Sequence, residues 1–516
     1  MKWSLTLLSL LAIECAREAA FPPVAKAQPS RGCELAAWVM QQQPHSTRTL
    51  EAPPPVLRDT FITVNGIQEN ISIPAGFTMT VFARNIPSCR GLGLSPDGVI
   101  YATSANGNVY ALPDLEHTGF ADSTIVVTSG LGDPDCVAFY KGQLYVSNNS
   151  AFYELVTSAQ SRVAQSKIKI ASFPPAGDHY TRNFIFDTAN QKVYVQIGSY
   201  GNMDTTDYAH RARIVEMNPD GTGYRSFASG LRNPEGLDID PRTGALWANC
   251  NGMDNIYGSG TELTDNNPSE GIYLVCDGAN YGWPWCYGFR MRNPQMMNLD
   301  TSIVQTFDGP VAEVLAHSAP LSLHFYRGTK FPAMYHDAIF QCYHGSWDRT
   351  PPAPPRITVM WADTDGKNAR VTDFVNGFQP DSNGTRWGRV VSIIEGGDSA
   401  LYVSDDQAGA VYRIAYTGAP SGVRDDPPSP IFTVSQPMPN PAQRIIRIDI
   451  TLSKPAFVKA ELYDVAGHEV RRLLDEGLSP GTFPLLIGTE DLANGAYILS
   501  VSSSGETVSR RIVIAR

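Results

Sequence analysis

The sequence predicts an all-β protein, a six-bladed β-propeller followed by a small C-terminal β-sandwich. The 44 glycines and 38 prolines among 516 residues indicate many turns, as in a β-rich chain. An aromatic residue recurs in six short apolar strands, and alternating strands resume after a segment rich in Pro, Ser and Asp. Because the chain is too long for one ordinary core, we expect one large domain and at least one smaller one.

The N-terminus is typical of an export signal. Lys2 precedes the apolar run WSLTLLSLLAI, and Ala25-Lys26-Ala27 resembles a cleavage site, so we assign residues 1–27 to a signal peptide. Residues 28–72 show little periodicity and are expected to form an N-terminal lead-in. No later stretch is apolar for long enough to span a bilayer, so no transmembrane segment is expected.

The propeller is predicted over residues 73–416. The six aromatic strands are VIYAT (Tyr101), QLYVS (Tyr145), KVYVQ (Tyr194), ALWAN (Trp247), AIFQC (Phe340) and ALYVS (Tyr402). Successive aromatic residues are 44, 49, 53, 93 and 62 positions apart, and four of these spacings are near the length of a propeller blade. The spacing of 93 is expected to contain an insertion. A pair of β-sandwiches is the alternative.

Residues 417–431 are rich in Pro, Ser and Asp and are predicted to be a linker. Residues 432–516 contain alternating strands and are predicted to form the β-sandwich. Met438-Pro439-Asn440-Pro441, LYDVAGHEVRRLL, Asn494-Gly495-Ala496-Tyr497 and a basic, apolar end resemble a type IX secretion C-terminal sorting domain. The resemblance implies the type IX secretion machinery as a partner and a secreted or cell-surface location, reached through the periplasm. A carbohydrate-binding or spacer sandwich is the alternative.

The composition excludes some classes of function. The net charge of −11 lacks the basic footprint of a nucleic-acid-binding protein, so no nucleic-acid partner is expected. The cysteines form neither CxxC pairs nor a CxxCH motif, so we expect neither zinc nor covalently attached haem. Seven cysteines follow the signal peptide; some should pair in an oxidising compartment, and at least one must remain unpaired.

Three polar loop segments stand beside strands of different predicted blades. They contain His179 and Arg182 (GDHYTRN), Arg232 and Asn233 (LRNPEG), and Arg349 (HGSWDR). All three could meet at one mouth of the central channel, where arginine forks suit an anionic, planar ligand. A neutral histidine there can take a proton from a substrate hydroxyl. Taken singly, a histidine in a β loop is more often a structural residue.

Several segments together resemble the glucose/sorbosone dehydrogenase family: IPAGFTMTVFA, DHYTRNFIF, VQIGSYGN, GLRNPEGLDIDPRTGALWANCNG, NYGWPWC and HGSWDR. Members are six-bladed propellers that bind pyrroloquinoline quinone (PQQ) with calcium and oxidise sugars. The resemblance implies that His179 is the general base while hydride passes to the quinone. It implies that Arg232 and Asn233 hold the cofactor, and that Arg182, Arg349 and Arg389 contact cofactor or substrate.

The resemblance also implies a calcium ion held largely by main-chain carbonyls. The matching positions are Gly252 and Met253, with Asp254 beside them. Such oxygen ligands suit a hard cation, which would polarise the quinone carbonyl. Because the chain has no haem module, we expect a separate electron acceptor, a quinone or a cytochrome.

Two residues depart from the family pattern. Glu235 stands where glucose-oxidising members carry Gln, and Asp348 stands where they carry a basic residue. Both changes add negative charge beside an acidic cofactor and place the chain nearer the sorbosone-type branch. The rival functions are a cofactor-free propeller that acts as a cell-surface binding module, and a calcium-dependent lactone hydrolase.

Overall fold

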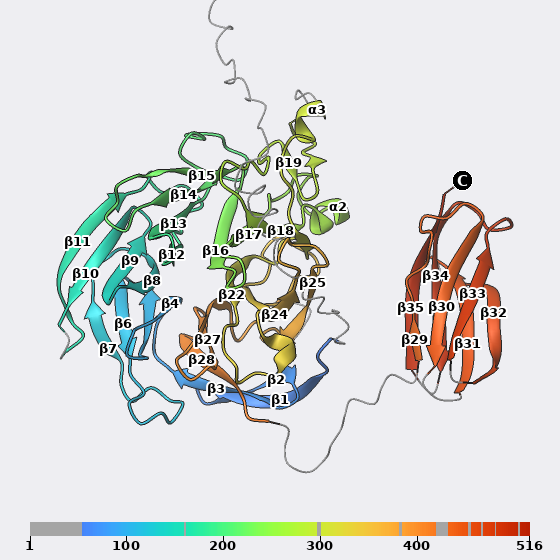
Figure 1. Ribbon diagram of the computed structural model, residues 1–516, viewed down its shortest axis with the longest axis horizontal. Coiled ribbons are helices and arrows are strands. Elements are labelled where there is room, and N and C mark those ends of the chain that lie inside the picture. The colour runs from blue at the N-terminus through green and yellow to red at the C-terminus, as the bar shows by residue number, and fades with distance from the viewer. Residues whose placement is uncertain are drawn as a thin grey trace, which may run out of the picture. The chain divides into compact units, whose positions relative to one another are not determined.

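The computed structural model describes residues 54–158, 161–296, 301–380, 384–418, 432–452, 456–465, 468–479, 481–503 and 506–515. The chain divides into two compact units, residues 1–419 and 420–516. The signal peptide predicted at residues 1–27 lies outside the described residues, as do most of the lead-in and of the linker. The all-β class is confirmed by the strands that make up both units (Figure 1).

The described residues of the first unit contain six four-stranded antiparallel sheets. The first three sheets, in chain order, are β4 (Cys89–Leu94), β5 (Ile100–Ser104), β6 (Asn108–Leu112) and β7 (Ile125–Thr128); β8 (Pro134–Tyr140), β9 (Gln143–Asn148), β10 (Ala151–Thr157) and β11 (Ala164–Ser172); and β12 (Phe184–Asp187), β13 (Lys192–Ile197), β14 (Arg213–Met217) and β15 (Arg225–Ser229).

The last three sheets follow the same plan. They are β16 (Asn233–Ile239), β17 (Leu246–Asn251), β18 (Glu270–Val275) and β21 (Ala312–Val314); β22 (Pro320–Phe325), β23 (Ile339–Tyr343), β24 (Arg356–Trp361) and β25 (Arg370–Val375), with the short helix η2 (Ala333–Tyr335); and β26 (Val390–Glu395), β27 (Leu401–Asp405), β28 (Ala410–Tyr416) and β3 (Phe77–Ala83).

Each of the six aromatic strands predicted from the sequence is the second strand of a different sheet. β5, β17, β23 and β27 are buried along almost their whole length. A strand covered on both faces needs a nearly continuous apolar run. The segments VIYA, LWA, IF and LYV of these strands are such runs.

The sheets follow one another in a cycle. The first strands touch in the order β4, β8, β12, β16, β22 and β26, and β26 contacts β4 again. β3, near the N-terminus, pairs with β28 at the end of the unit, with Met79 opposite Ile414; the blue and orange strands lie together in Figure 1. Residues at the two ends of the unit therefore complete one sheet.

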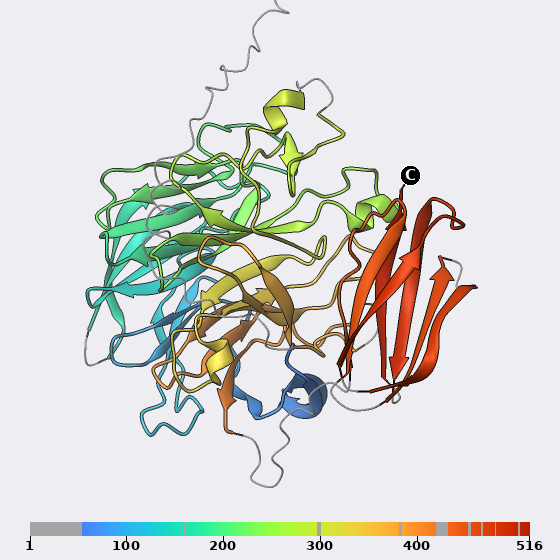
Figure 2. The same cartoon turned by 45° about the vertical axis from the view of Figure 1, so that its right-hand side comes forward.

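The long spacing between Trp247 and Phe340 contains an insertion, as predicted. It holds α2 (Glu262–Asn266), the two-residue strands β19 (Cys286–Tyr287) and β20 (Met291–Arg292), and α3 (Thr301–Val304). Thr261 caps α2, because its hydroxyl accepts a hydrogen bond from the amide of Thr264. In Figure 2 the insertion is the yellow-green part of the chain that carries the two helices.

The lead-in is more ordered than its sequence indicated. β1 (Leu57–Val64) and β2 (Ile67–Pro74) form an antiparallel hairpin around Asn65 and Gly66, both with positive φ. An Asn-Gly pair between β-prone runs is a strong hairpin signal, and it explains why this part of the lead-in is ordered although its sequence has little periodicity. Ser72 of β2 exchanges backbone hydrogen bonds with Asn376, so the hairpin is attached to the fifth sheet.

The second unit contains two sheets that share one hydrophobic cluster. One sheet has β29 (Phe432–Val434), β30 (Ile445–Leu452) and β33 (Gly481–Gly488); the other has β32 (Glu469–Leu478), β31 (Ala456–Asp464), β34 (Gly495–Ser503) and β35 (Glu506–Ile514). β30 alternates buried and exposed residues along its length, as expected for a strand with one covered face.

Cysteine pairing agrees with the expectation from the count. Cys276 is disulfide-bonded, and Cys89, Cys136, Cys250, Cys286 and Cys342 are free thiols.

Among the residues that the structure describes, we find no helix both long and apolar enough to cross a membrane.

We predict that Phe77→Ala lowers the free energy of unfolding by about 3–5 kcal/mol, because it leaves a cavity under the closing strand β3. The Phe77 ring lies 4.7 Å from that of Phe331 and 5.0 Å from that of Phe374, centre to centre. Denaturant unfolding measures the change. Phe61→Ala on the exposed face of β1 is the control and should cost at most about 0.5 kcal/mol; equal effects of the two substitutions would contradict the prediction.

Candidate active site

His179 lies in the loop between β11 and β12. Its Nδ1 is 2.8 Å from the Ser199 hydroxyl oxygen and 3.1 Å from the Ser199 carbonyl oxygen. The hydroxyl already donates to the Gly201 carbonyl, so both atoms of Ser199 act as acceptors toward the imidazole. Nδ1 therefore carries the proton and Nε2 presents a lone pair, the tautomer that a general base requires.

The environment keeps this imidazole neutral. Burial, and secondarily the positive charge of Arg232, lower the pKa of His179 to about 3. Among the described residues no hydrogen-bond partner contacts its Nε2. The lone pair is thus available for a substrate proton over the whole physiological pH range.

Gly198 brings His179 and Asn233 together. A β-carbon added at Gly198 would lie 2.5 Å from the His179 β-carbon and 2.6 Å from Asn233 Oδ1, so only glycine permits this approach. Asn233 Nδ2 donates to Glu235 Oε1 at 2.9 Å. Its buried Oδ1 has no hydrogen-bond partner among the described residues, which makes it available to a ligand.

Arg232 is the charged centre of the site. Its guanidinium contacts the Asp254 carboxylate at 2.8 Å and donates to the Asn202 carbonyl at 3.1 Å and to Asn202 Oδ1 at 3.0 Å. Asn202 in turn bonds both the amide and the carbonyl of Asp254, at 2.8 Å each. The Arg232 carbonyl accepts from the amide of Ser199, so the loops of His179, Arg232 and Asp254 form one network.

The loop predicted to bind calcium has two available carbonyls. Within the described residues, no hydrogen bond reaches the carbonyl oxygen of Gly252 or of Met253. The amide of Gly252 donates to Glu270, and the Met253 side chain is buried in a cluster with Trp283 and Tyr287. This anchoring fixes the backbone and leaves the two oxygens free for a cation.

Asp254 also faces two residues from other loops. His317 Nδ1 lies 3.8 Å from Asp254 Oδ1 and 3.3 Å from Asp348 Oδ2. Burial and the neighbouring Asp254 raise the pKa of Asp348, and the two carboxylates raise that of His317 to about 9 against the effect of burial. His317 was not among the residues predicted from the sequence, where no motif surrounds it.

Glu235 faces neutral donors. Its carboxylate accepts from Thr181 at 2.6 Å, from Asn233 at 2.9 Å and from Asn183 at 3.1 Å. Burial raises its pKa, so its negative charge is disfavoured. Glu235 departs from the family pattern and was expected to add negative charge beside the cofactor. Its carboxylate instead accepts hydrogen bonds from three neutral side chains.

The remaining predicted arginines are placed differently. Arg182 is fully buried and donates to the carbonyls of Pro174, His179 and Thr181, so it stabilises the loop that carries the histidine. Arg349 binds the Asp265 carbonyl and Asn266 of α2. Neither guanidinium forms a hydrogen bond with the His179 imidazole.

Arg389 lies in a separate charged group. Its Nε donates to the His344 carbonyl at 3.2 Å, and His344 Nε2 lies 3.0 Å from both Asp406 oxygens. Arg90, absent from the predicted residues because no motif marks it, contacts Asp406 at 3.2 Å. Burial lowers the pKa of His344 to about 4, so this group presents two arginines and one carboxylate.

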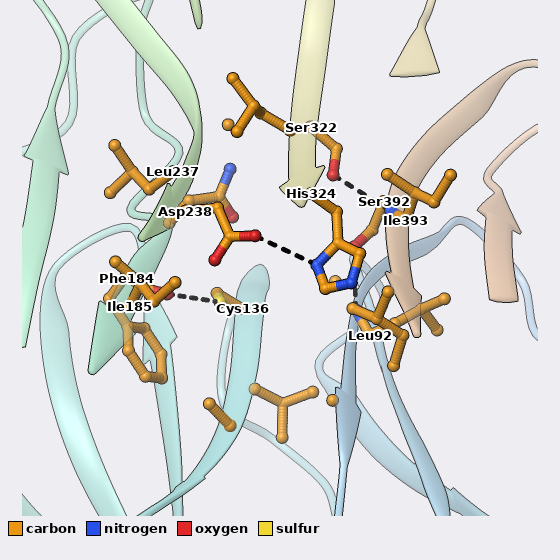
Figure 3. Close-up of a pocket in the computed structure, with 18 of the residues that line it drawn as sticks. Leu92, Cys136, Phe184, Ile185, Leu237, Asp238, Ser322, His324, Ser392 and Ile393 are labelled. Atoms are coloured by element: carbon orange, nitrogen blue, oxygen red, sulfur yellow. Dashed lines mark hydrogen bonds and ion pairs between the residues drawn. The ribbon is translucent and has the colours of Figure 1, made fainter. Parts of the chain in front are cut away.

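A cavity of about 330 Å³ runs along the first strands of all six sheets. Arg90, Asp135 and Glu235 line it near the residues described above, and Asp238 and His324 line it further along. Figure 3 shows the His324 ring directed toward Asp238, with Nδ1 3.3 Å from the carboxylate. The cavity therefore extends the site along the axis of the cycle of sheets.

Comparison with known families identifies both parts of the chain. Residues 71–417 match a family described as TrAA12-like, and residues 438–515 match one described as a secretion system C-terminal sorting domain. The resemblances inferred from the sequence are thereby confirmed, and the sorting domain indicates export to the cell surface or beyond it.

Individual relatives are distant. An uncharacterized protein of Borreliella burgdorferi is 27% identical over 69% of this chain and 93% of its own length. A pyrroloquinoline quinone-dependent pyranose dehydrogenase of Coprinopsis cinerea is 24% identical over 47% of this chain, and the match spans 40% of that enzyme.

Solved structures share the fold of the first unit. The calcium structure of a Trichoderma reesei enzyme of carbohydrate-active family AA12 superposes with a TM-score of 0.60 at 17% identity, covering 67% of this chain and 96% of that one. The holo form of the PQQ domain of the Coprinopsis cinerea pyranose dehydrogenase gives 0.58 at 20% identity, covering 67% and 97%.

We predict that the His179 ring stays neutral from pH 7 down to about pH 4. An exposed histidine, with a pKa near 6.5, gains its proton in this range; NMR of histidine-labelled protein measures the ring, with the signal assigned by its loss in His179→Gln. Because the folded-state pKa is the lower one, this group's contribution to stability is complete above pH 6.5 and is lost as the pH falls toward 3. A midpoint near 6.5 for His179 would contradict the assigned burial and tautomer.

Proposed function

Because the chain belongs to the TrAA12-like family, we propose that it is a secreted quinoprotein that oxidises a sugar by hydride transfer to PQQ, with His179 as the general base. The observation that carries this proposal is the neutral His179 imidazole. Its Nδ1 is joined through Ser199 to the hydrogen-bond network of Arg232 and Asp254, and its Nε2 is free. A base of this kind contributes about 10²–10⁴-fold to a rate.

The available donors and acceptors fit the proposed cofactor. Arg232 and Arg389 offer guanidinium groups from the loops before β16 and β26, and such groups suit the carboxylates of a flat acidic ring. The unpaired Oδ1 of Asn233 is available to the cofactor, and the free carbonyls of Gly252 and Met253 supply oxygen ligands, the kind that calcium requires. Arg182 and Arg349 are positioning residues in this proposal, because their donors are already bound to the backbone and to α2.

The residues of this chain divide the remaining work. When bound, PQQ supplies the hydride acceptor and calcium polarises its carbonyl. His179 Nε2 accepts the proton of the sugar hydroxyl, while Nδ1 keeps its own proton and donates it in a hydrogen bond to Ser199, which keeps the ring oriented. The electrons then pass to a separate acceptor, a quinone or a cytochrome.

The proposal extends to the architecture. We assign residues 73–416 to a six-bladed β-propeller, supported by the cyclic contacts of β4, β8, β12, β16, β22 and β26. Residues 432–516 are assigned to a β-sandwich, supported by the core that its two sheets share. Residues 417–431 then serve as the linker, and type IX secretion carries the chain across the outer membrane.

We predict that His179→Gln lowers dye reduction at least about 100-fold while PQQ still binds. Purified protein is loaded with PQQ and calcium and assayed with a panel of aldoses and pyranoses; cofactor binding is followed separately by absorbance. His468→Gln, at an exposed histidine of the second unit, is the matched control and should retain full activity. A wild-type chain that binds no PQQ would favour the binding-module alternative.

We also predict that removal of residues 432–516 keeps the protein inside the cell in a host with type IX secretion. The sorting domain is then missing while the first unit, with its own core, is intact. Immunoblots of cell and medium fractions measure the distribution against the full chain. Equal export of both forms would contradict the assigned role of this domain.

A further inference from the structure

We propose that Asp254, His317 and Asp348 form a binding site for a divalent transition-metal ion, separate from the carbonyl oxygens proposed for calcium. The three residues stand in three loops, which follow β17, β21 and β23. One ligand atom of each lies within 4.8 Å of the other two. Nothing in the family resemblance pointed to His317.

The distances fit metal coordination better than hydrogen bonding. His317 Nδ1 is 3.3 Å from Asp348 Oδ2 and 3.8 Å from Asp254 Oδ1. Hydrogen bonds between nitrogen and oxygen span about 2.7–3.2 Å, so the separation of 3.8 Å is too long for one and that of 3.3 Å is at the upper end of the range. Ligand atoms held about 2.0–2.1 Å from a tetrahedral ion lie roughly 3.3–3.4 Å apart, close to the shorter of these distances.

The imidazole is held in the orientation that a metal ligand needs. His317 Nε2 lies 2.7 Å from the Thr264 carbonyl of α2 and 3.3 Å from the Asn267 carbonyl. A carbonyl can only accept, so Nε2 carries a proton and Nδ1 faces the two carboxylates. Metal-binding histidines characteristically donate their second ring nitrogen to such a backbone carbonyl.

The burial of Asp348 is independent evidence that these residues can bind a cation. Its side chain is only 5% exposed, yet neither of its oxygens has a hydrogen-bond partner among the described residues. A buried carboxylate without partners is costly, and a second carboxylate, that of Asp254, lies close to it. A protonated His317 presents a single N–H to these oxygens and cannot satisfy them all, whereas a divalent ion can.

The donor set selects the class of metal. Calcium takes oxygen ligands, whereas one imidazole with two carboxylates and an open position suits zinc and related ions. The expectation that zinc is absent considered only cysteine ligands. Asp254 uses its second oxygen for Arg232, so the ion would neutralise Asp348 and connect three loops to the network of His179.

Metal titration of the full chain without PQQ tests this site alone. Chelator-treated protein is titrated with Zn²⁺, Co²⁺ and Ca²⁺ by calorimetry, and Co²⁺ is also followed by its visible absorption. We expect one equivalent of Zn²⁺ or Co²⁺, no displacement of Co²⁺ by Ca²⁺, and no thiolate charge-transfer band. Asp348→Asn and His317→Gln should each weaken Zn²⁺ binding at least about 100-fold.

Asp365→Asn, which removes a surface carboxylate paired with Lys367, is the matched control and should bind as the wild type does. Circular dichroism checks that each variant folds. If Asp348→Asn does not fold, the visible Co²⁺ absorption of the wild type, with or without a thiolate charge-transfer band, tests the proposed ligands instead. Absence of a bound equivalent, unchanged affinity in the folded variants, preference for Ca²⁺ or a thiolate band would overturn the proposal. Each outcome is independent of dye reduction, so this site and the dehydrogenase proposal can fail separately.

Discussion

The pairing of β3 with β28 is the constraint on which the site depends. It completes the sixth sheet from the two ends of the unit and allows β26 to contact β4, so the first strands form a closed cycle. Loops that leave those strands at one end must then face a common axis. Arg90, Asp135 and Glu235 stand far apart in the sequence, and their common position on the axial cavity follows from this closure.

Within that frame, backbone anchors do most of the positioning. Ser199 holds His179, Asn202 holds Arg232 and Asp254, and Gly198 allows His179 and Asn233 to approach. None of these residues needs to touch a substrate. They come from one segment, IGSYGN, which follows β13, and so a single loop organises groups from three others. Such a site is stiff because each functional group has its unused donors bound.

The sequence allowed the strands to be predicted, together with several loop residues that the structure brings together in the candidate site, because their signals are local. The buried second strand of each sheet requires a continuous apolar segment. His179, Arg232 and Gly252 lie in segments typical of a known family. His317, Arg90 and Glu270 could not be predicted in this way, since their partners are distant in the chain and no motif surrounds them. Arg182 shows the converse: its motif is clear, but in the structure its two terminal nitrogens donate to carbonyls of its own loop.

The two acidic departures from the family pattern show how burial decides the effect of a substitution. Glu235 and Asp348 each place a carboxylate near a site expected to bind an acidic cofactor. Three neutral donors satisfy Glu235, and its raised pKa reduces the charge it presents. Burial and Asp254 raise the pKa of Asp348 as well, and it lacks such donors, so its charged form needs His317 or a bound cation beside it. The carboxylate of Glu235 is therefore satisfied by neutral donors, whereas that of Asp348 forms a ligand set with His317 and Asp254 beside Arg232.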